Sequence, residues 1–351
     1  MASSSTLAPD APITAPAPPP ARPAGRWPAL DAFRGLALCM MIVHHLAEWT
    51  GGRARHRIVG FEGFAVTDLA APAFALGAGA AAFLVGQQIR AAGAPWSSLS
   101  WRRARRALRR YGEVLALGLA IDIAVGGGID GGGVLPTLAA LGALVTLGSL
   151  AGLVHPAAWW GIAAVCAVTA IPVTSANPEG LVAQLWAGSF SIVVYGVFAA
   201  AGAALAAGAR GRGEGALPLL PAATAVLVFG GVVAWVAPAQ TAPDGLWPPA
   251  RHPGGLAFTT WGLAGSLVLW AVVRVVVPRL GRVGAGLTRA GRRTLLVFGL
   301  HYLVKLALQH GGWQGELDTW RWGLVTWGAG LVACLLATVP PSRRRPARAT
   351  A

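Results

Sequence analysis

The chain has 351 residues, of which 55% are hydrophobic and 12% charged, and its formal net charge is +15. Soluble domains carry about 45–50% apolar and about 25% charged residues. This composition excludes a soluble globular enzyme and a disordered protein. It also argues against a nucleic-acid partner, because the basic residues lie between long apolar stretches, as in the loops of membrane proteins. We therefore expect an all-α, polytopic integral membrane protein.

Three regions are distinguished along the chain. Residues 1–25 are rich in Pro, Ala and Ser without a continuous apolar run, which predicts a disordered cytoplasmic tail rather than a signal peptide. Residues 26–340 are expected to form a transmembrane helical domain, and residues 341–351 a basic cytoplasmic tail. A membrane-spanning helix needs about 20 apolar residues. About ten candidate spans are expected, over residues 29–48, 64–86, 112–128, 134–154, 157–173, 181–208, 216–237, 254–277, 293–310 and 321–339.

The arginines predict the orientation of these spans. With the N-terminus inside, the cytoplasmic segments carry 21 arginines and the outer loops carry five. Because basic loops are retained in the cytoplasm, both termini are expected there. We expect the chain in a bacterial cytoplasmic membrane. The sequence contains no convincing internal repeat, which weakens an interpretation as an inverted-repeat transporter.

The first two spans contain ionisable residues, which are costly inside lipid and therefore indicate function. Asp31 and Arg34 are three residues apart on one helical face and can pair, either as a structural ion pair or as part of a polar channel. His45, His56 and Asp68 are expected near the outer membrane surface. A histidine held by a carboxylate is a common general base, although these side chains could equally be hydrated at the interface.

His44 precedes His45 and is expected to point about 100° away from it, towards lipid headgroups or another helix. Later in the chain, His301 and Lys305 lie one turn apart in an apolar segment. Lys305 could extend to the outer interface. We favour a polar cavity that these two residues share with the first two spans, including Asp31 and Glu62.

A basic run follows the second span. Its arginines are either a topology signal that faces anionic lipid or a group that binds the phosphates of a nucleotide-bearing cofactor. They are Arg102, Arg103, Arg105 and Arg106. In the second span, Ala75, Gly77 and Gly79 form a small-residue face suited to close helix packing, which would also permit a homodimer.

The order of these features resembles the heparan-α-glucosaminide N-acetyltransferase family of the transmembrane acyltransferase superfamily. The resemblance is carried by Leu30-Asp31-x-Phe33-Arg34-Gly35-Leu36-Ala37, by His45, by His56 and by Gly63-Phe64-x-Val66-Thr67-Asp68-Leu69-x-x-Pro72. Weaker similarity lies in Gly133-Val134-Leu135 and in Gly291-Arg292-Arg293-Thr294-Leu295-(x)5-His301. The chain departs from the family where Pro136-Thr137 stands in place of a frequent Gln.

The resemblance implies an acetyl-CoA-dependent acyltransferase that acts across the membrane. Acetyl-CoA would bind from the cytoplasm, and the acyl group would pass to an amine or hydroxyl of an extracytoplasmic sugar or envelope glycan. His56 would be the general base or a transient acyl carrier, Asp68 would orient it, and His45 would bind the acceptor or the thioester oxygen. The donor would be bound by Arg34, Arg102, Arg103 and Arg106. No metal is expected, because the histidines lack ligand spacing.

Two other functions are compatible with the same residues. A transporter or flippase could use the polar side chains of the spans as a translocation path and proton relay. A non-catalytic relative could keep the helical domain without the chemistry.

Overall fold

The computed structural model describes residues 26–49, 60–61, 64–91, 101–125, 192–236 and 256–310. Within these ranges the chain is helical, apart from an antiparallel hairpin with two residues in each strand, which confirms the all-α class. The elements in chain order are α1 (Pro28–Trp49), β1 (Gly60–Phe61), β2 (Phe64–Ala65), the 3-10 helix η1 (Val66–Leu69), α2 (Ala70–Ala91), α3 (Trp101–Val125), α7 (Ile192–Gly208), η3 (Glu214–Ala216), α8 (Leu219–Val236), α10 (Leu256–Val276), η4 (Val277–Arg279), α11 (Gly281–Arg292) and α12 (Thr294–His310).

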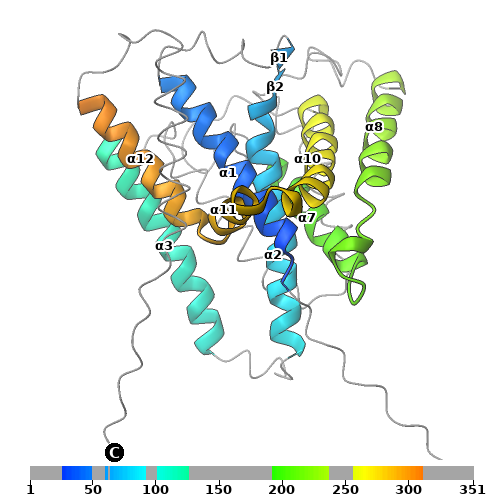
Figure 1. Cartoon of the computed structure of the whole chain (residues 1–351), viewed down its shortest axis with the longest axis horizontal. Coiled ribbons are helices and arrows are strands. Elements are labelled where there is room, and N and C mark those ends of the chain that lie inside the picture. Colours follow the sequence, from blue (N-terminus) through cyan, green and yellow to red (C-terminus); the bar gives the residue numbers. More distant parts are fainter. Residues whose placement is uncertain are drawn as a thin grey trace, which may run out of the picture.

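Most described helices coincide with predicted spans, since long apolar runs specify them locally. One exception is α3, which begins at Trp101 rather than near residue 112 and so includes the basic run. The arginines of this run can extend the helix because arginine is a good helix former. Helices α2 and α3 both reach beyond the lower ends of the other helices (Figure 1). The expected spans 134–154, 157–173 and 321–339, and both predicted tails, lie outside the described residues.

Three described helical segments are long and apolar enough to cross a membrane. They are Ala70–Gln87, Glu214–Val233 and Phe258–Arg279. Helix α8 exposes Val228, Phe229 and Trp235, the last of them 84% accessible. Large contiguous apolar surfaces are rare on soluble monomers. The length and apolar composition of these segments, together with the apolar surface of α8, are typical of a membrane protein.

The core lies where α1, α2, α7 and α10 meet. The rings of Phe33 and Trp270 stack with their centroids 5.3 Å apart, and Phe198 meets Phe258 edge-on at 6.3 Å. Gly79 brings α2 against α7, because a Cβ atom there would collide with the carbonyl group of Ala199. The small-residue face predicted for this span is thus used for helix packing.

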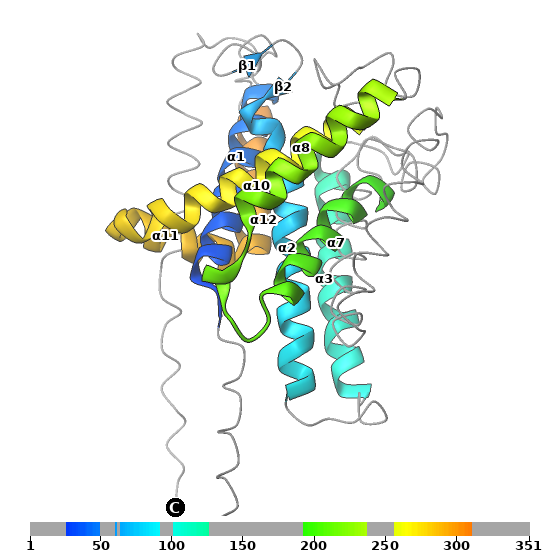
Figure 2. The ribbon, with the colours of Figure 1, turned by 90° about the vertical axis from the view of Figure 1, so that its right-hand side faces the viewer.

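Helix α11 was not foreseen from the sequence, which suggested a basic loop between two spans. It follows a sharp bend at Gly281, where φ is 52°, a conformation that glycine adopts without a Cβ penalty. It lies across the molecule between the ends of α10 and α12 instead of running along them (Figures 1 and 2). This placement brings α11 against the first turns of α1.

Candidate functional site

A buried histidine and a buried aspartate meet near the C-terminal end of α1. The Nδ1 atom of His44 lies 3.9 Å from Oδ1 of Asp68, and the two side chains are only 5% and 4% exposed. His44 is carried by α1, and Asp68 by η1, which leads into α2. The separation is within ion-pair range but longer than a hydrogen bond. Two titratable groups enclosed together in this way have the composition of a general-base pair.

This pair changes the expected arrangement of the outer site. His44 does not face lipid headgroups, since it is buried against Asp68. His45 lies in α1, about 100° further round the helix, and its side chain is outside the described residues. His56 and Glu62 also lie outside the described residues, so their predicted roles stay predictions. The sequence offered two adjacent histidines, and the packing of η1 on α1 brings the first of them beside Asp68.

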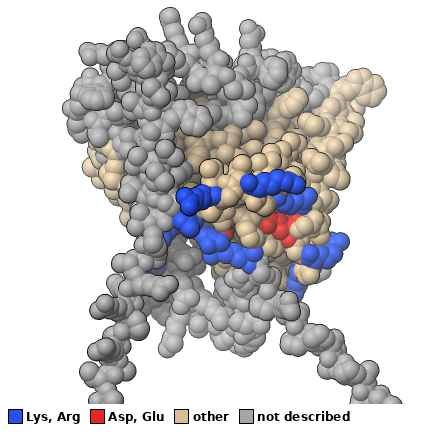
Figure 3. Space-filling model, in the orientation of Figure 1, with Lys and Arg blue, Asp and Glu red and all other residues tan. Residues whose placement is uncertain are grey.

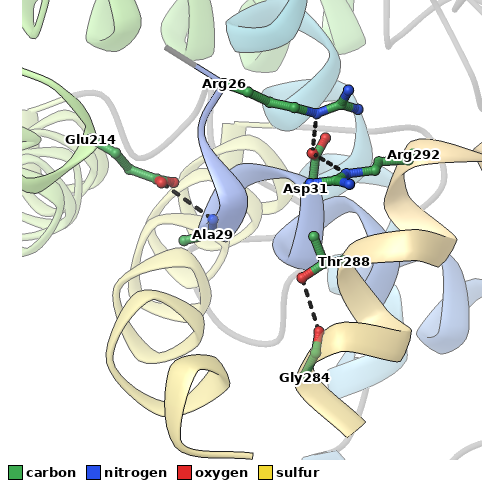
Figure 4. A network of polar contacts seen from close by, with 7 residues as sticks. All are labelled: Arg26, Ala29, Asp31, Glu214, Gly284, Thr288 and Arg292. Atoms are coloured by element: carbon green, nitrogen blue, oxygen red, sulfur yellow. Dashed lines mark hydrogen bonds and ion pairs between the residues drawn. The ribbon is translucent and has the colours of Figure 1, made fainter. Parts of the chain in front are cut away.

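A second polar cluster surrounds Asp31 at the N-terminal end of α1 (Figure 4). Arg26 Nε donates to Asp31 Oδ2 at 2.6 Å, and Arg292 Nε of α11 donates to the same oxygen at 3.0 Å. The carboxylate is 8% exposed, whereas the arginines are 60% and 42% exposed. No ion pair joins Asp31 to Arg34 among the described residues, although the charge of Asp31 still acts on the Arg34 guanidinium. The Asp31 carboxylate is occupied by one arginine that precedes the helix and another 261 positions later.

Arg34 extends from α1 in another direction. Its Nη2 group donates to Thr294 Oγ1 at the first residue of α12 (3.2 Å), and its guanidinium carbon lies 5.9 Å from the centre of the Phe74 ring. Its stem crosses Gly77, where a Cβ atom would touch the Arg34 Cγ. The Nε atom is buried without a hydrogen-bond partner among the described residues. A buried guanidinium donor of this kind is suited to an anionic oxygen, since burial without a partner is costly.

Glu214 holds the start of α1 in place from a distant part of the chain. Its Oε2 atom accepts the backbone N–H of Ala29 at 3.2 Å, and its Oε1 atom accepts the indole N–H of Trp270 at 3.2 Å. Arg274 donates to the carbonyl oxygens of Glu214 and Leu217 at 3.1 and 3.2 Å. A carboxylate at a helix N-terminus satisfies an unpaired N–H and interacts favourably with the helix dipole. The contact therefore ties the first turn of α1, which carries Asp31, to η3 and α10.

The remaining predicted residues are only partly described. His301 of α12 is 1% exposed, its Nδ1 contacts the carbonyl of Phe298, and its ring packs on Phe298 and Tyr302. These contacts lie within α12, so the cavity proposed to join it to the first two spans stays a prediction. The side chain of Lys305 is outside the described residues.

The basic run forms the first turns of α3, but the side chains of Arg102, Arg103 and Arg106 are also outside the described residues. Further along α3, Arg109 pairs with Glu113 at 2.9 Å on an exposed face. Among the described side chains, no three His, Cys, Asp or Glu residues gather as metal ligands.

Sequence reasoning missed three contributors to these clusters. They are His44, Arg292 and Glu214, which pair with Asp68, Asp31 and the α1 N-terminus. Usable signals existed for His44, which adjoins His45, and for Arg292, which lies in the Gly-Arg-Arg-Thr segment before an apolar helix.

No family model matches the chain, and no curated protein sequence matches it.

Proposed function

We propose that this chain is a membrane-embedded acyltransferase that moves an acetyl or other acyl group from cytoplasmic acyl-CoA to an extracytoplasmic sugar or envelope glycan. In this proposal the domain has about ten spans with both termini in the cytoplasm of a bacterial cell. The acceptor group is an amine or a hydroxyl. The observation that carries the proposal is the buried pair of His44 and Asp68.

The pair supports general-base catalysis. With Asp68 on the Nδ1 side of the ring, a proton on Nδ1 makes Nε2 the basic nitrogen of His44. Nε2 would take the proton from the acceptor as its nitrogen or oxygen attacks the thioester carbonyl. The C–S bond then breaks, and the CoA thiolate leaves. General-base catalysis of this type contributes about 10²–10⁴-fold to a rate.

Two further histidines keep the roles that the family resemblance implies. His45 would bind the acceptor or the thioester oxygen, and His56 would act as base or acyl carrier in place of, or in sequence with, His44. Separate substitution of the three histidines distinguishes these roles, because only an acyl carrier would retain labelled acetyl on the protein.

The arginines around Asp31 support a donor site at the opposite end of α1. Arg26 and Arg292 share the Asp31 carboxylate and Arg34 lies three residues further along α1, so the cluster carries an excess of positive charge. Guanidinium groups match the geometry of phosphate oxygens. Arg34 and His44 are ten residues apart on α1, or about 15 Å. An extended acyl-CoA could bind with its phosphates near Arg34, assisted by Arg102, Arg103 and Arg106, and its thioester towards His44.

The first test is calorimetry of the detergent-purified chain with acetyl-CoA and with CoA. We expect micromolar binding of both ligands and at least tenfold weaker binding by Arg34→Gln. Absence of binding to either ligand would overturn the acyltransferase proposal and favour the transporter or flippase. Those alternatives are then tested by flux through proteoliposomes.

The second test measures transfer of labelled acetyl from acetyl-CoA to a glucosamine acceptor. We expect His44→Gln to lower turnover by 100-fold or more, as general-base catalysis requires, and Asp68→Asn to lower it less. The control is Ser266→Ala, which removes a buried hydroxyl of α10 that has no hydrogen-bond partner among the described residues. It should leave turnover within about twofold. Full activity of His44→Gln would remove this residue from the mechanism.

A further inference from the structure

Helix α11 occupies a particular position relative to the membrane-spanning segments. The apolar segment Phe258–Arg279 ends two residues before α11 begins at Gly281, and α12 begins at Thr294 soon after α11 ends. With 12 residues, α11 is about 18 Å long, which is too short to cross a hydrocarbon layer of about 30 Å. It lies across the ends of the neighbouring helices (Figures 1 and 2). In a bilayer, α11 therefore lies at the depth where the headgroups begin.

The two faces of α11 differ in composition. Gly284, Ala290 and Gly291 are buried, and a Cβ atom at Gly291 would collide with the backbone of Asp31 in α1. The opposite face carries Arg282 and Arg289, which are seven residues apart and therefore on the same side of the helix. Both arginines are exposed. The buried face is thus fixed by small residues against α1, and the basic face is directed outwards.

Basic and apolar side chains are exposed together at this location. Arg279 precedes α11 and is exposed, as is Arg292 at its end. Leu280 and Val283 are exposed by 42% and 65%. Figure 3 shows basic side chains gathered on the face of the molecule where Figure 1 places α11. Cations beside apolar side chains at the end of a spanning segment match the boundary between acyl chains and phosphate headgroups.

We propose that the outward face of α11 is a binding site for anionic phospholipid, such as phosphatidylglycerol. Arg279, Arg282 and Arg289 would pair with the headgroup phosphate, while Leu280 and Val283 contact the upper acyl chain. The occupant is a lipid because the site is continuous with a spanning segment and pairs positive charge with exposed apolar surface. This inference requires that the chain lies in a bilayer, and it is independent of the acyltransferase activity.

The test is native mass spectrometry of the full chain in detergent, titrated with dioleoyl phosphatidylglycerol or with dioleoyl phosphatidylcholine. We expect tighter binding of phosphatidylglycerol. Each basic residue near an anionic surface is worth about a fivefold change in affinity, so Arg282→Gln/Arg289→Gln should weaken phosphatidylglycerol binding by about 25-fold. Replacement of both by lysine should preserve binding within a few-fold, because it keeps the charge.

The matched control removes two exposed arginines elsewhere. Arg210 and Arg212 lie in the turn after α7, and Arg210→Gln/Arg212→Gln removes the same charge. We expect it to change phosphatidylglycerol binding by less than about threefold. Equal binding of the two lipids, equal losses in both glutamine variants, or no loss in the α11 variant would each overturn the proposal. The thermal midpoint of each variant without added lipid reports folding, and Arg282→Gln alone replaces the double variant if that midpoint falls.

Discussion

Glu214 accepts a hydrogen bond from the backbone N–H of Ala29, a residue 185 positions earlier in the chain. The carboxylate therefore acts as an N-terminal cap for α1, although it belongs to the turn between α7 and α8. Its other oxygen accepts the indole N–H of Trp270 in α10. One side chain thus joins three segments that hold the Asp31 cluster in position.

This contact predicts the effect of changing Glu214. Glu214→Ala should lower the free energy of unfolding by about 2 kcal/mol, since it removes a helix cap and leaves buried donors without partners. Glu214→Gln should cost roughly half as much, because one oxygen remains as an acceptor. The measurement is the denaturant midpoint in a fixed detergent, followed by tryptophan fluorescence.

The control for Glu214 is Glu113→Ala. That carboxylate pairs with Arg109 on an exposed face of α3, and such pairs contribute about 0.3–0.5 kcal/mol. Equal midpoints for the two alanine variants would show that the Glu214 contacts do not stabilise the fold.

Substitution of Asp31 should lower the free energy of unfolding more than substitution of either arginine partner. Asp31→Asn removes both ion pairs from a buried position and should cost about 1–3 kcal/mol. Arg26→Gln should cost less than about 1 kcal/mol, because this arginine is 60% exposed and well screened. The denaturant midpoints of the variants test this order. A larger loss for Arg26→Gln than for Asp31→Asn would contradict the shared-carboxylate arrangement.

Two glycines of α11 should respond to alanine in opposite ways. Gly291→Ala places a methyl group against the backbone of Asp31 and should destabilise the fold by about 1–3 kcal/mol. Gly286→Ala meets open space in the same helix and should be neutral or stabilising by up to about 1 kcal/mol. Thermal midpoints in detergent distinguish the two. If both variants behaved alike, the close crossing of α1 and α11 would be wrong.

The contact between α2 and α7 makes a similar prediction. Gly79→Ala and Gly202→Ala should each destabilise the chain, because their Cβ atoms would meet the carbonyl oxygens of Ala199 and Leu76. A cost of about 1–3 kcal/mol is expected for each. Gly112→Ala is the control, since nothing lies within 4 Å of that position in α3. Loss of stability in the control alone would contradict this packing.

The sequence by itself determined the class of protein and the positions of most described helices. Long apolar runs such as those of α8, α10 and α12 specify helices locally, and their length and low charge make them suited to a membrane. The small residues of α2 likewise indicated a packing face before the partner helix was known. These features depend only on residues close together in the chain.

Only the tertiary structure decided which polar residues meet. Helical spacing suggested a pair of Asp31 with Arg34, but the partner that α11 supplies lies 261 positions away. The contact of His44 with Asp68 depends on how η1 packs on α1, which no local pattern encodes. Helix α11 could not be predicted from the sequence because its buried face is made of glycine and alanine, which give no apolar periodicity. Such contacts depend on the relative placement of whole helices, so they are set by packing across the fold.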